Sequence, residues 1–443
     1  MALNTFPPIR QQFLDGTNTP RKHLEATLAA IEALESTLHG FASFCTEART
    51  AADASSARYQ AGKPLSALDG CPIGVKDIIE TRDAPTQMNS PVFTGWESGR
   101  DAPSVHALRE AGAVIVGKTH TTEFAIGRSS PAANPYDLTR TPGGSSSGSA
   151  GLVGGGLLPI ALGTQTAGSI LRPASFCGAY GFKPSHGLLS TVGIHPLSKS
   201  LDTLGVIAAS LEDCWHGVYA MWRWTGSDQS ALEALGETPP RSKLRHKRFG
   251  WLRTDGWKDL DAESEHAFMT AVSKLREAGA DVIDANTDDD LAALETSLRG
   301  IGELNTDIVR AEIRYPMTLY MERDASALSE RIRSMVEAGA KLDGGARRAL
   351  LERQRRLRDS VAQLANRFDG FLTMASTGPA PVGLEYTGDR TFLSPWSVIG
   401  GPAFSLPALE CQNLPVGLQV MGYWGADTAA AEMASWIADQ LIP

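Results

Sequence analysis

The stretch TPGGSSSGSAGLVGGGLLPIALGTQTAGSILRPASFCGAYGFKPSHG, residues 141–187, differs in composition from the rest of the chain. Glycine accounts for 44 of the 443 residues, about 10% where an average protein has about 7%. Residues 143–205 alone contain 14 glycines. Glycine-serine runs are typical of flexible linkers. This one is bounded by apolar, strand-like sequence, so it is predicted to be closely packed backbone, because glycine lets main chains approach each other closely.

Strand-like and helix-like segments alternate on both sides of the glycine-rich stretch. Apolar runs at residues 71–78, 113–119 and 158–166 are typical of buried strands. Residues 149–158 favour a helix rich in glycine and alanine. Strand-like runs return near the C-terminus, before a final helix at residues 426–441. This order predicts an α/β fold with one large mixed β-sheet covered on both faces by helices.

The chain is expected to form a single domain over residues 1–443, because no long linker rich in proline and serine interrupts it. A more charged, helical stretch at about residues 288–367 is predicted to be a peripheral helical layer. The aromatic residues Phe392, Trp396, Tyr423 and Trp424 would either line a substrate funnel or pack in the core, and the core is favoured.

The charge and the cysteine content limit which partners and which cellular location the sequence favours. The formal net charge is −9, with 41 Lys+Arg and 50 Asp+Glu, which disfavours nucleic acid and anionic membranes as partners. No apolar run reaches the roughly 18 residues of a membrane-spanning helix, and the N-terminus lacks the apolar part of a secretory signal. The five cysteines are odd in number and show no CxxC spacing, so reduced thiols and a cytoplasmic location are expected.

Two short motif matches are rejected. Residues 112–119, GAVIVGKT, fit the phosphate-loop pattern, but the residues between the glycines are apolar and mostly β-branched, and they predict a strand. Residues 144–148, GSSSG, fit a nucleophile elbow, which requires a buried strand leading into the serine. A polar turn region precedes them instead. Neither nearby histidine, His186 or His195, lies in a context that suggests a catalytic base.

Ser169 ends a turn of small residues, Thr166-Ala167-Gly168-Ser169. Such a turn can direct successive backbone N–H groups at one point and hold the negative oxygen of a tetrahedral intermediate. A nucleophilic serine needs a base. Without a credible histidine, a lysine kept neutral by burial is the chemical alternative. Lys76, in the apolar run 71–78, is the best candidate, although the pattern also fits a solvated lysine at a sheet edge.

Four blocks carry a resemblance to a known family: GVKDIIETRDAPTQMNS (74–90), AGAVIVGKTHTTEFA (111–125), the stretch 141–187 and LPVGLQVMG (414–422). In these blocks the chain resembles the amidase signature family of serine hydrolases. The resemblance covers nearly the whole chain and implies the amidase signature fold and a Ser-cis-Ser-Lys triad. Ser169 would be the nucleophile, Ser145, on a cis peptide, the bridging serine, and Lys76 the base. The backbone of residues 166–169 would hold the oxyanion, and neither a metal nor a cofactor is implied.

The turn at Ser169 departs from the commonest pattern of that family. The usual TDxGGSIR is here TQTAGSILR, with Gln165 for aspartate, Ala167 for glycine, and the arginine one position later at Arg172. This arrangement resembles the malonamidase-like branch, in which the equivalent arginine binds a substrate carboxylate. Arg172 is therefore expected either to bind a carboxylate or to brace the fold. Ala167 requires that the turn is held at negative φ there, or is strained.

The resemblance implies hydrolysis of the C–N bond of a small carboxamide through an acyl-enzyme, an activity of EC 3.5.1 type, with an acidic, malonamate-like amide as one possible substrate. The catalytic core is expected at about residues 70–210. The alternative is a role like that of the amidase-fold component of a glutamine-dependent amidotransferase, which passes ammonia to a partner's active site. An inactive scaffold is disfavoured, because all three triad residues are present. The family is often dimeric, and the basic stretch 346–358 is a candidate surface for a homodimer.

Overall fold

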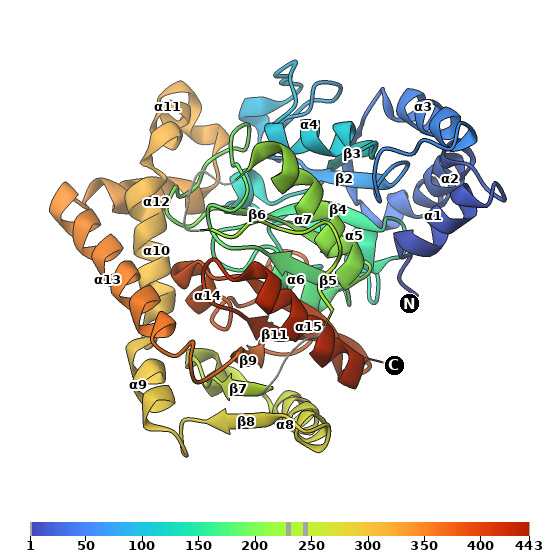
Figure 1. The fold of residues 1–443 in the computed structure, drawn as a ribbon. Helices are drawn as coiled ribbons and strands as arrows, with labels where there is room; N and C mark the ends of the chain where they lie inside the picture. The colour runs from blue at the N-terminus through green and yellow to red at the C-terminus, as the bar shows by residue number, and fades with distance from the viewer. Residues whose placement is uncertain (1, 227–231, 242–246, 443) are drawn as a thin grey trace.

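The strands of the chain form one mixed β-sheet (Figure 1). The structure, a computed structural model, describes residues 2–226, 232–241 and 247–442. Within these residues eleven strands lie in the order β1-β3-β2-β4-β6-β5-β10-β11-β9-β7-β8. They span Phe41–Phe44 (β1), Pro72–Lys76 (β2), Val114–Thr119 (β3), Ile160–Gln165 (β4), Tyr180–Lys183 (β5), Thr203–Ala208 (β6), Arg248–Trp251 (β7), Asp281–Asp284 (β8), Gly370–Met374 (β9), Ala403–Cys411 (β10) and Leu414–Met421 (β11). The predicted α/β fold is confirmed.

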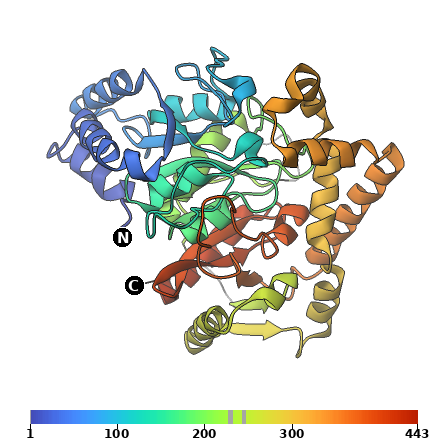
Figure 2. The ribbon, with the colours of Figure 1, turned by 180° about the vertical axis from the view of Figure 1, so that it is seen from behind.

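Helices flank this sheet (Figures 1 and 2). The α-helices span Phe6–Leu14 (α1), Pro20–Leu38 (α2), Ala48–Gln60 (α3), Pro103–Glu110 (α4), Ser147–Gly154 (α5), Leu171–Phe176 (α6), Leu211–Thr225 (α7), Ala262–Glu277 (α8), Asp289–Ser297 (α9), Ile301–Glu312 (α10), Arg314–Asp324 (α11), Glu330–Ala340 (α12), Gly344–Ala362 (α13), Ser394–Ile399 (α14) and Asp427–Leu441 (α15). Short 3₁₀ helices span Pro91–Phe93 (η1), Glu123–Ala125 (η2), Asp255–Asp259 (η3) and Ala325–Ala327 (η4).

Parallel pairing occurs in two groups of three strands. β2 pairs in parallel with β3 and β4, and β7 pairs in parallel with β8 and β9. The antiparallel strands β6, β5, β10 and β11 connect the two groups, so strands from the C-terminal part complete the sheet. Because β2 and β4 are parallel neighbours, their carboxyl ends lie at the same edge of the sheet.

The strands β2, β3 and β4 are buried along their whole lengths. Parallel strands with both faces covered have continuous apolar sequences, and the predicted runs 71–78, 113–119 and 158–166 contain these three strands. β2 ends at Lys76, two residues before its predicted end. Lys76, the last residue of β2, and Lys118, the last but one of β3, are both fully buried.

The helix α5 packs closely through its glycines. Every residue from Ser147 to Gly154 is buried. A Cβ atom on Gly148 would collide with the carbonyl oxygen of Gly40, and one on Gly154 would collide with the carbonyl oxygen of Cys177. The glycine-rich stretch is therefore closely packed backbone, as predicted, because any larger residue at these positions would push two main chains apart.

Helices α9 to α13 lie together along one side of the molecule (Figures 1 and 2). They fall within the stretch 288–367, the predicted peripheral helical layer. α10 packs against α14, which joins this layer to the C-terminal part of the chain. On α13, Arg347 contacts Glu312 and Arg353 donates to the carbonyl of Arg299, so part of the basic stretch 346–358 binds its own chain. The single domain, its core at 70–210 and the homodimer surface stay predictions.

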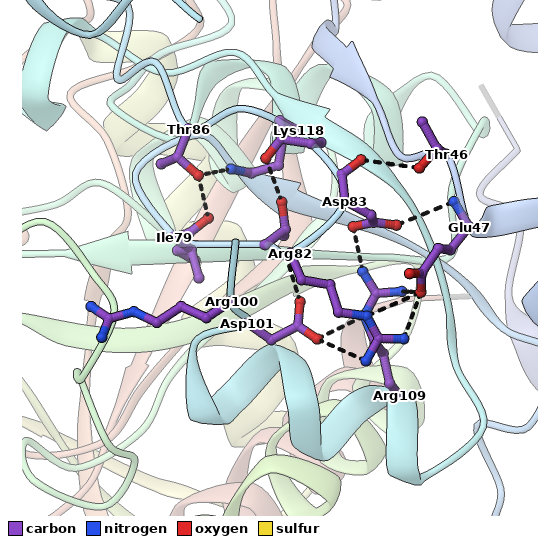
Figure 3. A network of polar contacts seen from close by, with 12 residues as sticks. Thr46, Glu47, Ile79, Arg82, Asp83, Thr86, Arg100, Asp101, Arg109 and Lys118 are labelled. Atoms are coloured by element: carbon purple, nitrogen blue, oxygen red, sulfur yellow. Dashed lines mark hydrogen bonds and ion pairs between the residues drawn. The ribbon is translucent and has the colours of Figure 1, made fainter. Parts of the chain in front are cut away.

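A network of arginines and carboxylates joins α3 and α4 to the segment after β2 (Figure 3). Arg109 lies 2.6 Å from Asp83, 3.2 Å from Asp101 and 3.6 Å from Glu47. The side chains of Arg109, Asp83 and Asp101 are only 9%, 2% and 5% exposed. Buried carboxylates require a partner of opposite charge. Arg109 therefore compensates the charge of two buried aspartates.

Replacement of Arg109 by leucine is expected to lower the free energy of unfolding by about 3 kcal/mol, because it leaves the buried Asp83 without an ion pair among the described residues and Asp101 with only its longer contact to Arg82. The matched control is Arg100→Leu, since Arg100 pairs with Glu80 but is 70% exposed, and an exposed pair contributes about 1 kcal/mol or less. Urea unfolding of both variants measures the difference. Equal stability of the two would show that the network is not a stabilising element.

Candidate active site

A cavity of about 170 Å³ lies beside the carboxyl end of β4. Residues 166–169, which follow β4, line it together with Ser145, which precedes α5. Lys76 ends the neighbouring parallel strand β2 and reaches the same edge of the sheet. Ligands of α/β proteins bind at the carboxyl ends of parallel strands. The fold thus brings the three predicted site residues Lys76, Ser145 and Ser169 to one edge, although they are far apart in sequence.

Lys76 is hydrogen bonded to Ser145. Its Nζ atom lies 2.7 Å from Ser145 Oγ and 2.8 Å from Thr164 Oγ1, and it donates to the Thr164 carbonyl at 3.4 Å. The peptide bond between Gly144 and Ser145 is cis, as the resemblance implies. The alternative of a solvated lysine at a sheet edge is wrong, because Lys76 is fully buried on a strand with neighbours on both sides.

Burial lowers the pKa of Lys76 well below its ordinary value. The negative charge of Asp202 opposes this effect and the positive charge of Arg172 adds to it. Because desolvation disfavours the charged form of an amine, the surroundings favour a neutral Lys76. A neutral amine beside a hydroxyl can accept a proton from it, which the ammonium form cannot do.

The turn at residues 166–169 is held through its carbonyl groups. The Thr166 carbonyl accepts from Asn305 Nδ2 at 3.0 Å, and the Ala167 carbonyl accepts from Ser397 Oγ at 2.7 Å. The Gly168 carbonyl accepts from the backbone N–H of residue 172. In the described part of the chain no hydrogen bond engages the Ser169 hydroxyl, which lines the cavity.

The two substitutions in this turn have structural reasons. Gln165 accepts from the N–H groups of Ile170 and Leu171 through Oε1 and donates to Ser397 through Nε2. A carboxylate here could not donate to that hydroxyl. Ala167 is not among the described residues with positive φ, so the turn is held at negative φ there, as its sequence requires.

The Arg172 guanidinium, on α6, makes bracing contacts. Nη2 donates to the Gly144 carbonyl at 2.6 Å and to Thr387 Oγ1 at 3.2 Å, and Nη1 donates to the Gly388 carbonyl at 2.8 Å. Burial, with the nearby positive charge of Arg390, lowers the pKa of Arg172 to about 10. These bonds fix the peptide group that precedes Ser145. Arg172 also lines the cavity, so a role in carboxylate binding stays a prediction.

Asp202 belongs to the site but was not predicted. Its carboxylate accepts from Thr166 Oγ1 at 2.6 Å and from the N–H groups of Leu197 and Ser198 at 2.8 and 2.9 Å. Burial raises the pKa of Asp202 to about 6. The carboxylate ties the start of the turn to the loop before β6 and acts on the charge of Lys76. A single aspartate before an apolar run was the only sequence signal.

The two histidines lie outside the cavity lining, as the rejection of a histidine base predicted. His195 is buried, its ring packs near Phe124 and Tyr320, and burial lowers its pKa to about 3. His186 is hydrogen bonded to the Lys199 carbonyl at 3.1 Å, and burial lowers its pKa to about 4. Neither ring forms a hydrogen bond with Ser169 in the part of the chain that the structure describes.

The rejected phosphate-loop match forms a strand, as predicted. Val114–Thr119 is β3, and Lys118 is bonded to Thr86 Oγ1 at 2.6 Å (Figure 3). Lys118 Nζ also lies 3.3 Å from Asp77 Oδ1, inside the protein. This lysine therefore neutralises a buried carboxylate and is not available to a phosphate group.

The aromatic residues near the C-terminus do not line the cavity. Phe392 and Trp396 are fully buried in the core. The Tyr423 hydroxyl donates to the Phe368 carbonyl, and Trp424 Nε1 donates to the His186 carbonyl. The favoured interpretation as core is confirmed for Phe392 and Trp396, and the substrate-funnel alternative is wrong for all four.

Three further observations concern the described residues as a whole. All five cysteines are buried and unpaired. No three His, Cys, Asp or Glu side chains come together in an arrangement that fits a metal ion in the described ranges. No helix in this part of the chain is both long enough and apolar enough to cross a membrane.

Comparisons with known proteins support the fold and show the family of the chain. A family model described as Amidase matches residues 22–430. The glutamyl-tRNA(Gln) amidotransferase A subunit of Anaeromyxobacter dehalogenans is 33% identical over 90% of this chain and 88% of its own length. The corresponding protein of Rhodopirellula baltica is 36% identical over 64% of this chain, a match that spans only 59% of that protein.

Solved structures agree closely with the whole chain. A crystal structure of an amidase has a TM-score of 0.86 at 28% identity and covers 99% of this chain and 100% of its own. The native peptide amidase of Stenotrophomonas maltophilia has a TM-score of 0.84 at 26% identity, covering 99% of this chain and 96% of its own. The α/β fold, with its mixed β-sheet, and the match to the family model together define the class of protein as a hydrolase of C–N bonds. Within that class, the chain belongs to the amidase signature family. Its place in the malonamidase-like branch stays a prediction.

Proposed function

We propose that the protein hydrolyses the C–N bond of a small carboxamide through an acyl-enzyme on Ser169. The observation that carries this proposal is the 2.7 Å contact between the buried Lys76 Nζ and Ser145 Oγ, next to the cavity that Ser145 and Ser169 line together. A buried lysine that favours its neutral form, a bridging hydroxyl and an unengaged hydroxyl are the parts that a serine nucleophile without histidine requires.

In the first half of the reaction Ser169 Oγ attacks the carbonyl carbon of the amide. Its proton moves to Ser145 Oγ as the proton of Ser145 moves to Lys76 Nζ. When the tetrahedral intermediate collapses, the C–N bond breaks, and the same relay in reverse delivers a proton to the leaving nitrogen. Ammonia or an amine departs, and an ester remains on Ser169. The hydrogen bonds along which such a relay moves protons often shorten only when a substrate is bound.

Water completes the reaction on the same groups. It attacks the ester carbonyl while Lys76, through Ser145, accepts its proton, and the proton returns to Ser169 as the C–O bond breaks. The carboxylic acid product leaves, and the relay returns to its starting state. In both halves the proposed oxyanion donors are backbone N–H groups of residues 166–169. The bonds that occupy the carbonyls of Thr166, Ala167 and Gly168 support this assignment, because they fix the turn before the reaction begins.

The second candidate function is that of an amidotransferase component, which would release ammonia from glutamine for use in a partner's active site. The curated relatives favour this function over a free-standing amidase, since they are glutamyl-tRNA(Gln) amidotransferase A subunits with similarity over most of the chain. The chemistry at Ser169 would be the same. The difference lies in the substrate and in a macromolecular partner.

Ammonia release by the purified chain alone tests the two functions against each other. A free-standing amidase is expected to release ammonia from simple carboxamides at a rate that partner proteins do not change. An amidotransferase component is expected to act on L-glutamine, to be slow alone and to copurify with other proteins of its complex. Failure of every carboxamide to release ammonia, alone and with copurified partners, would contradict the proposed hydrolysis.

A further inference from the structure

We propose that Arg390 and Arg331 bind an anionic group of the substrate, so that the site selects a carboxamide that also carries a carboxylate. This inference rests on the proposed function and specifies the substrate class. Arg390 precedes α14 and Arg331 lies on α12. Both line the cavity that Ser169 lines, more than 160 positions along the chain from that serine.

The arginines of the cavity lack carboxylate partners. Arg172, Arg331 and Arg390 form no ion pair within 4.0 Å with any described residue. Arg390 Nη2 is bonded only to a neutral hydroxyl, Thr306 Oγ1, at 2.8 Å. Arginines elsewhere in the fold do pair with acids, as Arg109 and Arg367 show. The cavity therefore collects three positive charges that have no ion-pair partner among the described residues.

These three charges act on one another. Burial together with the positive charge of Arg331 lowers the pKa of Arg390, and Arg390 in turn lowers that of Arg172. Like charges held together in a partly buried site repel each other, and a bound anion removes this repulsion. A cavity of this charge is suited to a negatively charged group, which a planar guanidinium can bind through two hydrogen bonds.

Arg172 differs in its contacts from Arg331 and Arg390, and we assign it a different role. The guanidinium of Arg172 already donates to the carbonyls of Gly144 and Gly388 and to a threonine hydroxyl. The Arg331 side chain makes no hydrogen bond within the described chain, and it is exposed. Arg390 has donors left beyond its one bond to Thr306. Arg172 is accordingly a positioning residue for the peptide before Ser145, and recognition of the anion falls to Arg390 and Arg331.

Two acidic residues of the cavity offset only part of this positive charge. Asp389 accepts from the N–H of Thr391 at 2.6 Å, and Glu385 is exposed. Neither carboxylate forms an ion pair within 4.0 Å with a cavity guanidinium in the described structure, although the negative charge of Asp389 acts on both Arg172 and Arg390. An ammonium group in the substrate would face three guanidinium groups against two carboxylates, so these five side chains leave the cavity with a net positive charge. The charge therefore favours an amide that is only anionic over a zwitterion such as glutamine.

Three substrates of one chain length test the inference. Pentanamide is neutral, glutaramate adds a terminal carboxylate, and L-glutamine adds an α-ammonium group to glutaramate. The wild-type kcat/KM for glutaramate is expected to exceed that for pentanamide by about 10- to 100-fold, the worth of hydrogen bonds to a charged group. The value for L-glutamine should fall below that for glutaramate. Equal kcat/KM for glutaramate and pentanamide would overturn the inference and leave the proposed hydrolysis intact.

Two variants test whether the preference for glutaramate over pentanamide depends on Arg390 and Arg331. Arg390→Gln and Arg331→Gln are each expected to reduce the glutaramate to pentanamide ratio by about 10-fold or more. Arg331 is exposed, so its variant remains informative if Arg390→Gln does not fold. The control is Arg323→Gln, an exposed arginine of α11 outside the cavity lining, which should keep the wild-type ratio. A ratio unchanged in both test variants would overturn the inference.

Binding of glutarate, measured by calorimetry, separates this inference from the proposed function. Glutarate is expected to bind the wild type and Ser169→Ala alike and to bind Arg390→Gln and Arg331→Gln at least about 10-fold more weakly. If no amide is hydrolysed and glutarate still binds in this arginine-dependent way, the anion site stands and the proposed hydrolysis fails. Glutarate that binds neither the wild type nor the variants would overturn the anion site, and the proposed hydrolysis fails with it only if no carboxamide releases ammonia.

Discussion

Ser169→Ala is expected to lower kcat for carboxamide hydrolysis by about 10⁴-fold or more, equivalent to at least about 5.5 kcal/mol of activation free energy. The variant lacks the oxygen that forms the acyl-enzyme, and no other group in the proposed relay can replace it. KM should change little, because the hydroxyl contributes to the bond-making step and not to the binding of the amide. Ammonia release under saturating substrate measures the effect.

A matched control for Ser169→Ala is Ser129→Ala. Ser129 also lines the cavity, and its hydroxyl donates to the Glu385 carbonyl at 2.8 Å, away from the Lys76–Ser145 pair. Its loss is expected to cost less than about 10-fold in kcat/KM, the worth of one neutral hydrogen bond. Comparable losses in the two variants would indicate that Ser169 has only a structural role.

Lys76→Met is expected to lower kcat by an amount similar to that of Ser169→Ala, because groups that act as one relay fail together. Methionine fills most of the volume of the buried lysine but cannot accept a proton. The double variant with Ser169→Ala should be no slower than either single variant. Strictly additive losses would show that Lys76 acts outside the relay.

The pH dependence of activity and of stability follows from the direction in which the pKa of Lys76 is shifted. Activity requires the neutral amine, so kcat/KM should rise with pH through the lowered pKa of Lys76 in the free enzyme. The same shift predicts that stability rises with pH up to the ordinary lysine value, because the unfolded chain binds the proton more tightly over that interval. Lys76→Met should lack this contribution to the pH dependence of unfolding.

Lys183→Met is the control for the pH profile. Lys183 is buried at the end of β5, donates to the carbonyls of Pro184 and Gly401, and burial lowers its pKa to about 7. It does not line the cavity. A profile whose acid limb persists in Lys183→Met supports Lys76 as the titrating base, whereas an acid limb that disappears there would assign it to Lys183.

The sequence identified the local parts of the site and not the distant ones. One distinctive stretch contains Ser145, Ser169 and the turn that ends at Ser169. Lys76 lies in a second distinctive stretch, where a charged residue in an apolar strand is unusual. Asp202, Arg331 and Arg390 come from segments without such a pattern. Only the packing of α12 and of the segment before α14 brings the two arginines to the cavity, and only the pairing of β6 with β4 brings Asp202 to the turn, so no local rule of sequence contains that information.

The strands of the sheet likewise fall into those that the sequence predicts and those that it does not. Strands buried on both faces, such as β2, β3 and β4, have continuous apolar runs and were predicted. The short strands β1, β5, β7 and β8 have four residues each, too few to show a period of two or a distinctive run. Their place in the sheet depends on partners far along the chain. The two possible roles of Arg172 likewise required coordinates, because its bonds run to residues 28 and 216 positions away.

Mass spectrometry of a reaction stopped with acid during turnover of a carboxamide tests the central claim most directly. The acyl part of the substrate is expected on the peptide that contains Ser169 in the wild type, and it should be absent from Ser169→Ala. The ester should form together with the first released ammonia. An acyl group on a different residue, or rapid hydrolysis by Ser169→Ala without any ester, would contradict the account.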